Sequence, residues 1–292
     1  MAGGEPVAHS PATALPVVGW QAVTLSASNL LGSAVSRIRL HEAAAGEPAG
    51  QVNAGGPLLV LLADNRVGRQ NLERLSAWYD PAGTLVQRCR VGFGRSDSRA
   101  KCYRYEDRGI LRERRESDLT AADIASQPDW TRDGARSALA LARDWPVSSS
   151  GRLRLPDAIP ENAGLISPTL LLPLASAAPL QASGDSKAFF VHTDHDFFRV
   201  TLTVTGREPV AAEYRLDTDT GSQQIRNRIE ALVIRLETTP IGDPENGFEL
   251  LGLRPPLTLL LDPATRLPLA LRGDAPRLGP GEIRLEAARL SE

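Results

Sequence analysis

The chain has little net charge, little lysine and few aromatic residues, and these shortages exclude several classes of protein. Its formal net charge is −2 over 292 residues, so it has no bulk electrostatic attraction for nucleic acid or anionic lipid. Only two of its 33 basic residues are lysines, Lys101 and Lys187, and aromatic residues make up 5%. The arginines are interleaved with acids, as in Arg112–Glu116, which is typical of a solvated face. We therefore expect no nucleic-acid partner.

The chain also lacks a long uninterrupted apolar segment. The longest candidate, Pro168–Leu180, is broken by two further prolines and a serine and is too short to span a bilayer, so we expect no transmembrane segment. The first residues, Met1–Pro16, lack the basic start and the apolar stretch of a secretory signal. Two interpretations stay open: a cytoplasmic protein, or a periplasmic protein in its mature form, with the signal removed and a start methionine added.

There are only two cysteines, Cys89 and Cys102, and their positions bear on the compartment. They lie in two consecutive strand-like segments, Leu85–Val91 and Lys101–Glu106, on either side of a predicted turn at Gly94–Asp97. Opposite positions of an antiparallel pair are close enough for a disulfide. The pattern favours a disulfide over two buried free thiols, and a disulfide would indicate an oxidising compartment.

Apolar and polar residues alternate with a period of two in many short segments, which predicts half-buried strands. Phe198–Val204 is one such segment, with aromatic and aliphatic residues on one side and arginine and threonines on the other. The clearest hairpin joins Leu257–Leu261 to Leu267–Leu271 through a turn at Asp262–Thr265.

Helical patterns are rare by comparison. Ala138–Ala142 has helical spacing, and Leu165–Ala178 is consistent either with a helix entered through Pro168 or with a covering loop. Many strands with few helices between them favour antiparallel pairing over βαβ winding. The predicted fold is mainly β: a curved antiparallel sheet, or a barrel-like or half-barrel fold, with a few short covering helices.

The same sequence indicates how the chain is organised into domains. Residues 1–18 are small, polar and proline-rich, so we expect a flexible leader. Residues 19–292 are then a single β-rich domain in two halves, about 19–145 and 152–292. The segment Pro146–Gly151 (PVSSSG) is interpreted as a short connector between them.

Four segments carry a resemblance to a known family. They are an opening turn at Asn29–Ala34, arginine- and tyrosine-rich strands over Trp78–Glu116, a central stretch at Leu155–Ala158 with Leu170–Leu174, and a closing hairpin at Leu260–Leu269. In these the chain resembles the DUF3108 family of bacterial envelope proteins, most specifically in the closing hairpin. The resemblance implies a periplasmic or envelope protein with a barrel-like β fold, and it implies no catalytic residues.

The densest cluster of metal-binding residue types is His192, Asp194, His195 and Asp196. Histidine and carboxylate ligands at this spacing suit a divalent metal. The alternative interpretation is a hairpin turn, since aspartates favour turns and the flanking segments have strand patterns. The metal site is therefore a hypothesis that needs supporting geometry.

Motifs for catalysis are missing: the sequence has no Gly-x-Ser-x-Gly elbow and no phosphate-binding glycine loop, and no cofactor is expected. The leucine-dense segments Pro168–Leu180 and Pro255–Leu261 suggest a leucine-lined concave face capped by Leu165–Ala178. A lipid tail buried there would gain about 0.8 kcal/mol per CH₂ group. The favoured function is a non-enzymatic envelope protein that binds an apolar or amphiphilic, lipid-like molecule, or that assists envelope assembly with a partner protein. The alternatives are a glycan- or ester-acting hydrolase and a metal-binding protein.

Overall fold

The computed structural model describes residues 18–29, 32–43, 58–67, 71–106, 109–125, 134–161, 163–276 and 278–291. Most of the predicted leader lies outside these residues. Val18, its last residue, is buried in the core.

Strands dominate the described chain. They are β1 (Trp20–Asn29), β2 (Gly32–Glu42), β3 (Leu59–Val67), β4 (Asn71–Tyr79), β5 (Leu85–Phe93), β6 (Ser98–Glu106), β7 (Gly109–Ser117), β8 (Val147–Arg154), β9 (Leu165–Ile166), β10 (Ser186–His192), β11 (Phe197–Thr218), β12 (Gly221–Ile241), β13 (Arg254–Leu261), β14 (Pro268–Ala275) and β15 (Gly279–Leu290). The helices are short: α1 (Ala121–Ala125), α2 (Gly134–Arg143), the 3₁₀ turn η1 (Pro168–Leu170) and α3 (Leu171–Ala177).

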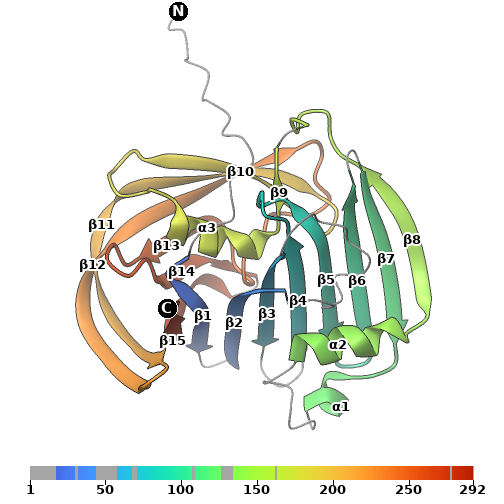
Figure 1. Ribbon diagram of the computed structural model, residues 1–292, viewed down its shortest axis with the longest axis horizontal. Coiled ribbons are helices and arrows are strands. Elements are labelled where there is room, and N and C mark those ends of the chain that lie inside the picture. Colours follow the sequence, from blue (N-terminus) through green and yellow to red (C-terminus); the bar gives the residue numbers. More distant parts are fainter. Residues whose placement is uncertain are drawn as a thin grey trace, which may run out of the picture.

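All these strands belong to one curved sheet (Figure 1). Strands β1 to β8 form an antiparallel meander, β10 to β15 form a second one, and β1 pairs with β15 to join the two halves. Strand β9 adds to β10 in parallel. Strand β11 also pairs in parallel with β15, through Arg215–Asp217, and this contact closes β11 to β15 into a ring. The predicted mainly β, barrel-like fold is thereby confirmed.

The core lies between the two halves of the sheet and surrounds α3 (Figure 1). Alternation places every second residue of β11 and β12 inward, so that Phe198–Val204 and Leu232–Leu236 meet the helix with their apolar sides. Helix α3 is apolar on all sides and buried throughout except at Ala177, as expected of a helix enclosed by sheet. Side-chain hydrogen bonds also hold this segment: Trp20 Nε1 donates to Ser176 Oγ of α3 at 3.0 Å, and the Tyr79 hydroxyl bonds Oγ of Ser167, just before η1, at 2.6 Å.

The two leucine-dense segments contribute to this core. Leu170–Leu174 are at most 6% exposed and Leu257–Leu261 carry four fully or almost fully buried leucines, all in the same cluster as α3. Most of these leucines pack in the core, and Leu260 also lines a pocket of about 390 Å³ together with Tyr214, Leu269 and Leu285. Helix α3 is itself buried in the core, and the cavity for a lipid tail stays a prediction.

The opposite side of β4 to β6 carries a second, smaller core. Leu72, Val91 and Ala100 pack there against α1 and α2, and Phe93 meets Trp145 edge-on at 5.9 Å between ring centroids. Helix α2 lies across the lower ends of these strands (Figure 1). Helices α1 and α2 cover this side of β4 to β6. The opposite side of β4 to β7 is the concave side of the sheet.

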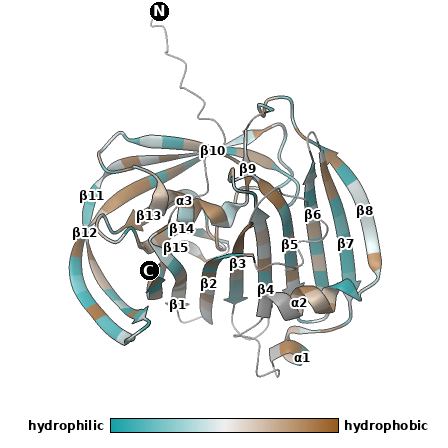
Figure 2. Cartoon of the chain, viewed as in Figure 1, coloured by the Kyte–Doolittle hydropathy of each residue, from teal (hydrophilic) through white to brown (hydrophobic). Residues whose placement is uncertain are grey.

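Two local predictions have clear outcomes. Cys89 and Cys102 pair across β5 and β6 in a disulfide, which confirms the predicted register. The predicted connector Pro146–Gly151 instead leads into β8, one of the two end strands of the sheet, which begins at Val147. The strand was missed because almost all its residues are exposed, so it has no apolar–polar alternation; in Figure 2 it is mostly pale or teal.

Candidate functional site

The His-Asp segment lies at the tip of the β10–β11 hairpin, where Thr193–Asp196 form what we call the tether turn. The hairpin interpretation of the sequence is thus confirmed. The turn rests on the concave side of β5 and β6, almost a hundred residues away in the chain. Arg88 from β5 donates to the carbonyl oxygens of His192 and Thr193, and the Tyr103 hydroxyl donates to the carbonyl of Asp194 at 2.8 Å.

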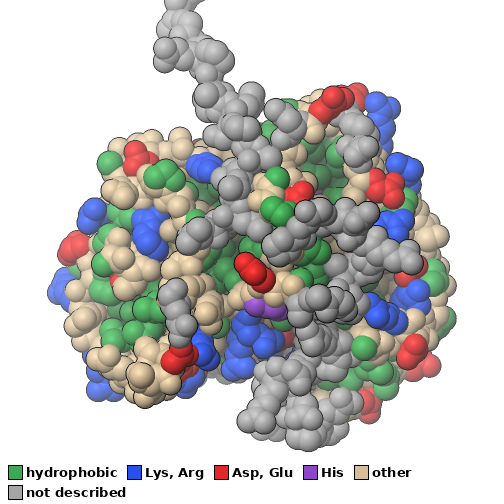
Figure 3. Space-filling view, viewed as in Figure 1, with side chains coloured by type: hydrophobic (Ala, Val, Ile, Leu, Met, Phe, Trp, Pro, Cys, Tyr) green, Lys and Arg blue, Asp and Glu red, His purple; other side chains and the backbone are tan. Residues whose placement is uncertain are grey.

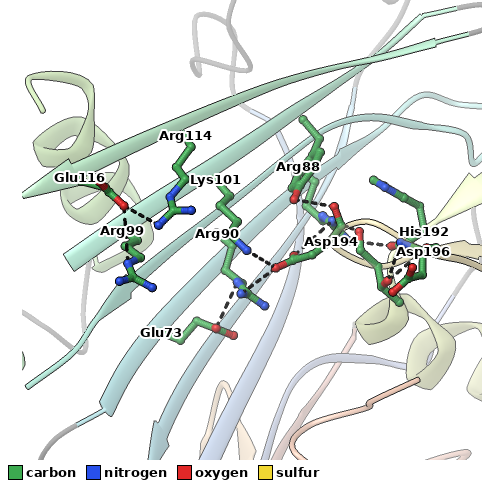
Figure 4. A network of polar contacts seen from close by, with 12 residues as sticks. Glu73, Arg88, Arg90, Arg99, Lys101, Arg114, Glu116, His192, Asp194 and Asp196 are labelled. Atoms are coloured by element: carbon green, nitrogen blue, oxygen red, sulfur yellow. Dashed lines mark hydrogen bonds and ion pairs between the residues drawn. The ribbon is translucent and has the colours of Figure 1, made fainter. Parts of the chain in front are cut away.

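Asp194 is the anionic centre of this contact (Figure 4). Its Oδ2 lies 2.7 Å from Lys101 Nζ and 2.9 Å from an Arg90 nitrogen, and its Oδ1 lies 3.8 Å from Arg88. Burial would raise the pKa of this carboxyl, but Arg90, Arg88 and Lys101 together hold it at about 2. The carboxylate is therefore charged and forms ion pairs with three cations at once.

Asp196 has a different role. Its carboxylate accepts the backbone N–H groups of Glu245 and Asn246 at 2.8 and 3.0 Å. These residues belong to the loop 242–253 between β12 and β13. Asp196 thereby holds that loop over the concave side of the sheet.

His192 is fully buried among aromatic rings. It stacks on Phe197 at 4.8 Å and meets Tyr103 and Tyr105 edge-on, and its Nδ1 bonds the Tyr105 hydroxyl at 2.7 Å. Burial, and then the nearby Arg88 charge, lower the pKa of the imidazole well below 6.5. The neutral ring is part of the packing between the halves.

The predicted metal site is not assembled. His192, Asp194 and Asp196 are each bound to other protein groups, and no cluster of three or more His, Cys, Asp or Glu side chains able to hold a metal occurs among the described residues. His195 lies in the same turn and completes no such cluster. The spacing of these residues in the sequence is compatible with a metal site. In the structure, however, their side chains contact groups of β5, β6 and the β12–β13 loop.

Cations line the concave side of β5 to β7. The pairing register places Arg90 opposite Lys101 and Lys101 opposite Arg114, and it places Tyr103 opposite Arg112, so these side chains share one side of the sheet. Figure 4 shows Arg90, Lys101 and Arg114 in neighbouring strands. Of the acids in these strands, Glu113 alternates to the other side, whereas Glu116 lies on this side opposite Arg99 and pairs with Arg99 and Arg114. A band that looks charge-balanced in sequence is therefore mainly cationic on this side.

A polar groove runs over this band. The part next to the tether turn, called the upper part below, has a volume of about 580 Å³. It is lined by Glu73, Arg88, Arg90, Lys101, Asp194 and Glu249. The lower part, about 440 Å³, shares Arg90 and Lys101 and adds Ala34, Val67, Arg99 and Leu251. Because both parts contain Arg90, Lys101 and Glu249, we treat them as one groove, which the loop 242–253 covers on one side. Its lower end offers apolar surface, since Val67 is 57% exposed.

Sequence reasoning missed this groove. The interleaved arginines and acids indicated a solvated face, and nothing in one strand tells which side faces a hollow. The usable signal was basic residues at alternate positions of three consecutive strands, for example Arg88 and Arg90, Arg99 and Lys101, and Arg112 and Arg114.

No protein family and no curated protein matches the chain, so the resemblance to DUF3108 stays a prediction. Among solved structures, the chain is similar to a β-barrel-like protein of the domain of unknown function DUF1849 from Brucella abortus, with a TM-score of 0.42 and 10% identity. The match covers 95% of this chain and 100% of that chain. None of the described helices has the length and hydropathy needed to cross a bilayer.

The buried His192 predicts a pH dependence of stability. The unfolded chain binds a proton at this histidine below about pH 6.5, whereas the folded chain does not until the pH is much lower. Stability should therefore fall with decreasing pH below 6.5, with a slope of up to about 1.4 kcal/mol per pH unit. Urea unfolding of the wild type and of His192→Asn between pH 7 and pH 5 measures this; parallel profiles of the two proteins would contradict it.

Proposed function

We propose that the protein is a non-enzymatic binding protein and that the polar groove takes an anionic amphiphile. The observation that carries the proposal is the groove itself: Arg90, Arg99 and Lys101 line a cleft whose lower end presents Val67 and Leu251. An anionic head group suits the cations, and a short apolar part suits the exposed aliphatic surface. The mainly β, barrel-like fold is compatible with a binding role.

The contacts of the tether turn favour a non-enzymatic binding protein over the two alternatives, a hydrolase and a metal-binding protein. His192 bonds a tyrosine hydroxyl, Asp194 neutralises cations, and Asp196 holds a loop, so each serves the packing of the two halves. These contacts lend no support to a hydrolase or to a metal centre.

The test is a binding titration with a soluble anionic phospholipid, dihexanoyl phosphatidylglycerol, against the zwitterionic dihexanoyl phosphatidylcholine. We expect the anionic lipid to bind more tightly and to weaken as salt is added. Arg99→Ala should weaken it about three- to tenfold, because Arg99 lines the groove and its own ion pairs are exposed.

The matched control is Arg104→Ala. Arg104 is in the same strand, β6, on the opposite side of the sheet, and its side chain is 59% exposed against 55% for Arg99. It should leave binding within about twofold. Equal binding of the two lipids, or equal loss in the two variants, would contradict the proposal.

The proposal includes an envelope location, and the disulfide between Cys89 and Cys102 supports it, since disulfides persist in oxidising compartments. Alkylation of denatured protein taken from its own host tests this. Labelled thiols at either cysteine would contradict the location.

A further inference from the structure

Strand β8 is the exposed end of the sheet. In the strand order it lies outermost and pairs only with β7 among the described strands. All its residues except Leu153 are exposed, and β8 contains no proline and no lysine, two of the common means of protecting an edge. In Figure 1 it stands free along one side of the molecule. An edge of this kind offers unpaired backbone groups to another strand.

On the concave side, two arginines of β7 lie next to this edge, while Glu113 lies next to it on the other side, opposite Ser150. Arg112 and Arg114 of β7 lie opposite Gly151 and Ser149 of β8, on the concave side. Glycine and serine place no long side chain beside these arginines, of which Arg114 is paired with Glu116. The side chain of Arg112 makes no ion pair or hydrogen bond with any described residue, and its Nε is buried without a partner. In the space-filling view, cationic and anionic side chains both lie along the side of the molecule where Figure 1 shows β8 (Figure 3).

The other side of β8 is also basic, since it carries Arg152 and Arg154. Their partners, Glu106 and Asp157, come from outside the strand, and β8 itself contains no acid. A second copy of β8 would add the same two arginines again and no acid of its own. The charges therefore disfavour a second copy of the chain and favour an acidic strand.

We propose that β8 is a docking edge for an acidic, extended segment of another protein, which adds to the sheet as a further strand. Strands two positions apart are separated by about 10 Å, a distance that an arginine and a glutamate side chain bridge together. Carboxylates at alternate positions of the incoming strand, opposite Ser149 and Gly151, then reach Arg114 and Arg112. This partner site is separate from the polar groove.

The experiment uses the full chain and a labelled peptide, Thr-Glu-Val-Glu-Thr-Glu-Val-Glu, with binding followed by fluorescence anisotropy. We expect saturable binding and slower hydrogen exchange at β8 amides. A peptide of the same charge with proline at alternate positions should not bind, because it cannot donate the ladder hydrogen bonds. Equal binding of the two peptides would overturn the proposal in favour of charge attraction alone.

Variants at Gly151 separate the docking edge from a general effect on folding. Nothing lies within 4 Å of a Cβ added at this glycine, so a side chain fits there. Gly151→Glu places a carboxylate beside Arg112 and should weaken peptide binding at least about tenfold, whereas Gly151→Ala should retain it. Equal affinities of these two variants would overturn the proposal, as would sedimentation showing that the chain dimerises through β8.

Discussion

Replacing Asp194 with alanine is expected to lower the free energy of unfolding by about 3–5 kcal/mol. The carboxylate is 22% exposed and joins three cations, of which Arg88 is only 4% exposed. Without it, Arg88, Arg90 and Lys101 face one another around a site where water replaces the lost charge poorly. The tether turn would lose its ionic contact with the first half of the sheet. Urea denaturation at pH 7 measures the loss.

The control is an aspartate whose ion pair is exposed. Asp97 lies 2.9 Å from Arg99, and the two side chains are 43% and 55% exposed. Asp97→Ala should therefore change stability by no more than about 0.5 kcal/mol. If Asp194→Ala changes stability as little as Asp97→Ala does, the tether turn does not hold the two halves together in the way described.

The same cluster has a consequence for the groove. Asp194 is a carboxylate of the chain itself, and it occupies the position between Arg90 and Lys101 that an anionic ligand would also favour. A ligand in the upper part of the groove therefore has to share these cations with Asp194, whereas Arg99 in the lower part has only exposed acids as partners. This is why the lower part, with Arg99 and Val67, is the better place for a head group and its apolar part.

Local patterns in the sequence were sufficient for the strands and their turns. The hairpin of β13 and β14 is visible because its leucines alternate on both sides of an Asp-Pro turn, and the register of Cys89 with Cys102 follows from the turn between them. These features depend on residues within about twenty positions of one another, where pattern and turn chemistry act together.

Features that depend on distant or missing contacts were predicted only in part or not at all. For Leu165–Ala178 the helix entered through Pro168 was one of two alternatives, and the structure has it; the sequence left the covering loop open because α3, surrounded by sheet, has almost no polar side to give it a helical period. Strand β8 has no buried side, so alternation is absent there too. The roles of Asp194 and Asp196 are set by β5, β6 and the loop 242–253, which no pattern around residue 194 reveals.

Removing Arg266 is expected to be as costly as removing Asp194. Helix α3 is buried and ends without a polar side chain able to satisfy its last carbonyl groups. The Arg266 guanidinium supplies these donors from the β13–β14 turn, at 2.8–2.9 Å from the carbonyl oxygens of Ala175, Ser176, Ala178 and Leu180. Arg266→Ala removes the donor from all four carbonyl groups, of which that of Ala178 still accepts the backbone N–H of Leu180, and we expect a loss of about 3–5 kcal/mol in urea denaturation.

Two further substitutions at this position distinguish the contribution of the Arg266 side chain to stability from that of its backbone conformation. Arg266 has a φ of 60°, which costs a non-glycine residue roughly 1 kcal/mol or more, so Arg266→Gly should be less destabilising than Arg266→Ala by about that amount. Arg266→Lys keeps the charge but lacks the planar fork, and it should recover only part of the loss. The control, Arg254→Ala, removes an exposed arginine paired with Glu249 and should have an effect within about 0.5 kcal/mol. An Arg266→Ala variant as stable as Arg254→Ala would show that the carbonyl groups at the end of α3 find other donors, and that the core does not depend on this cap.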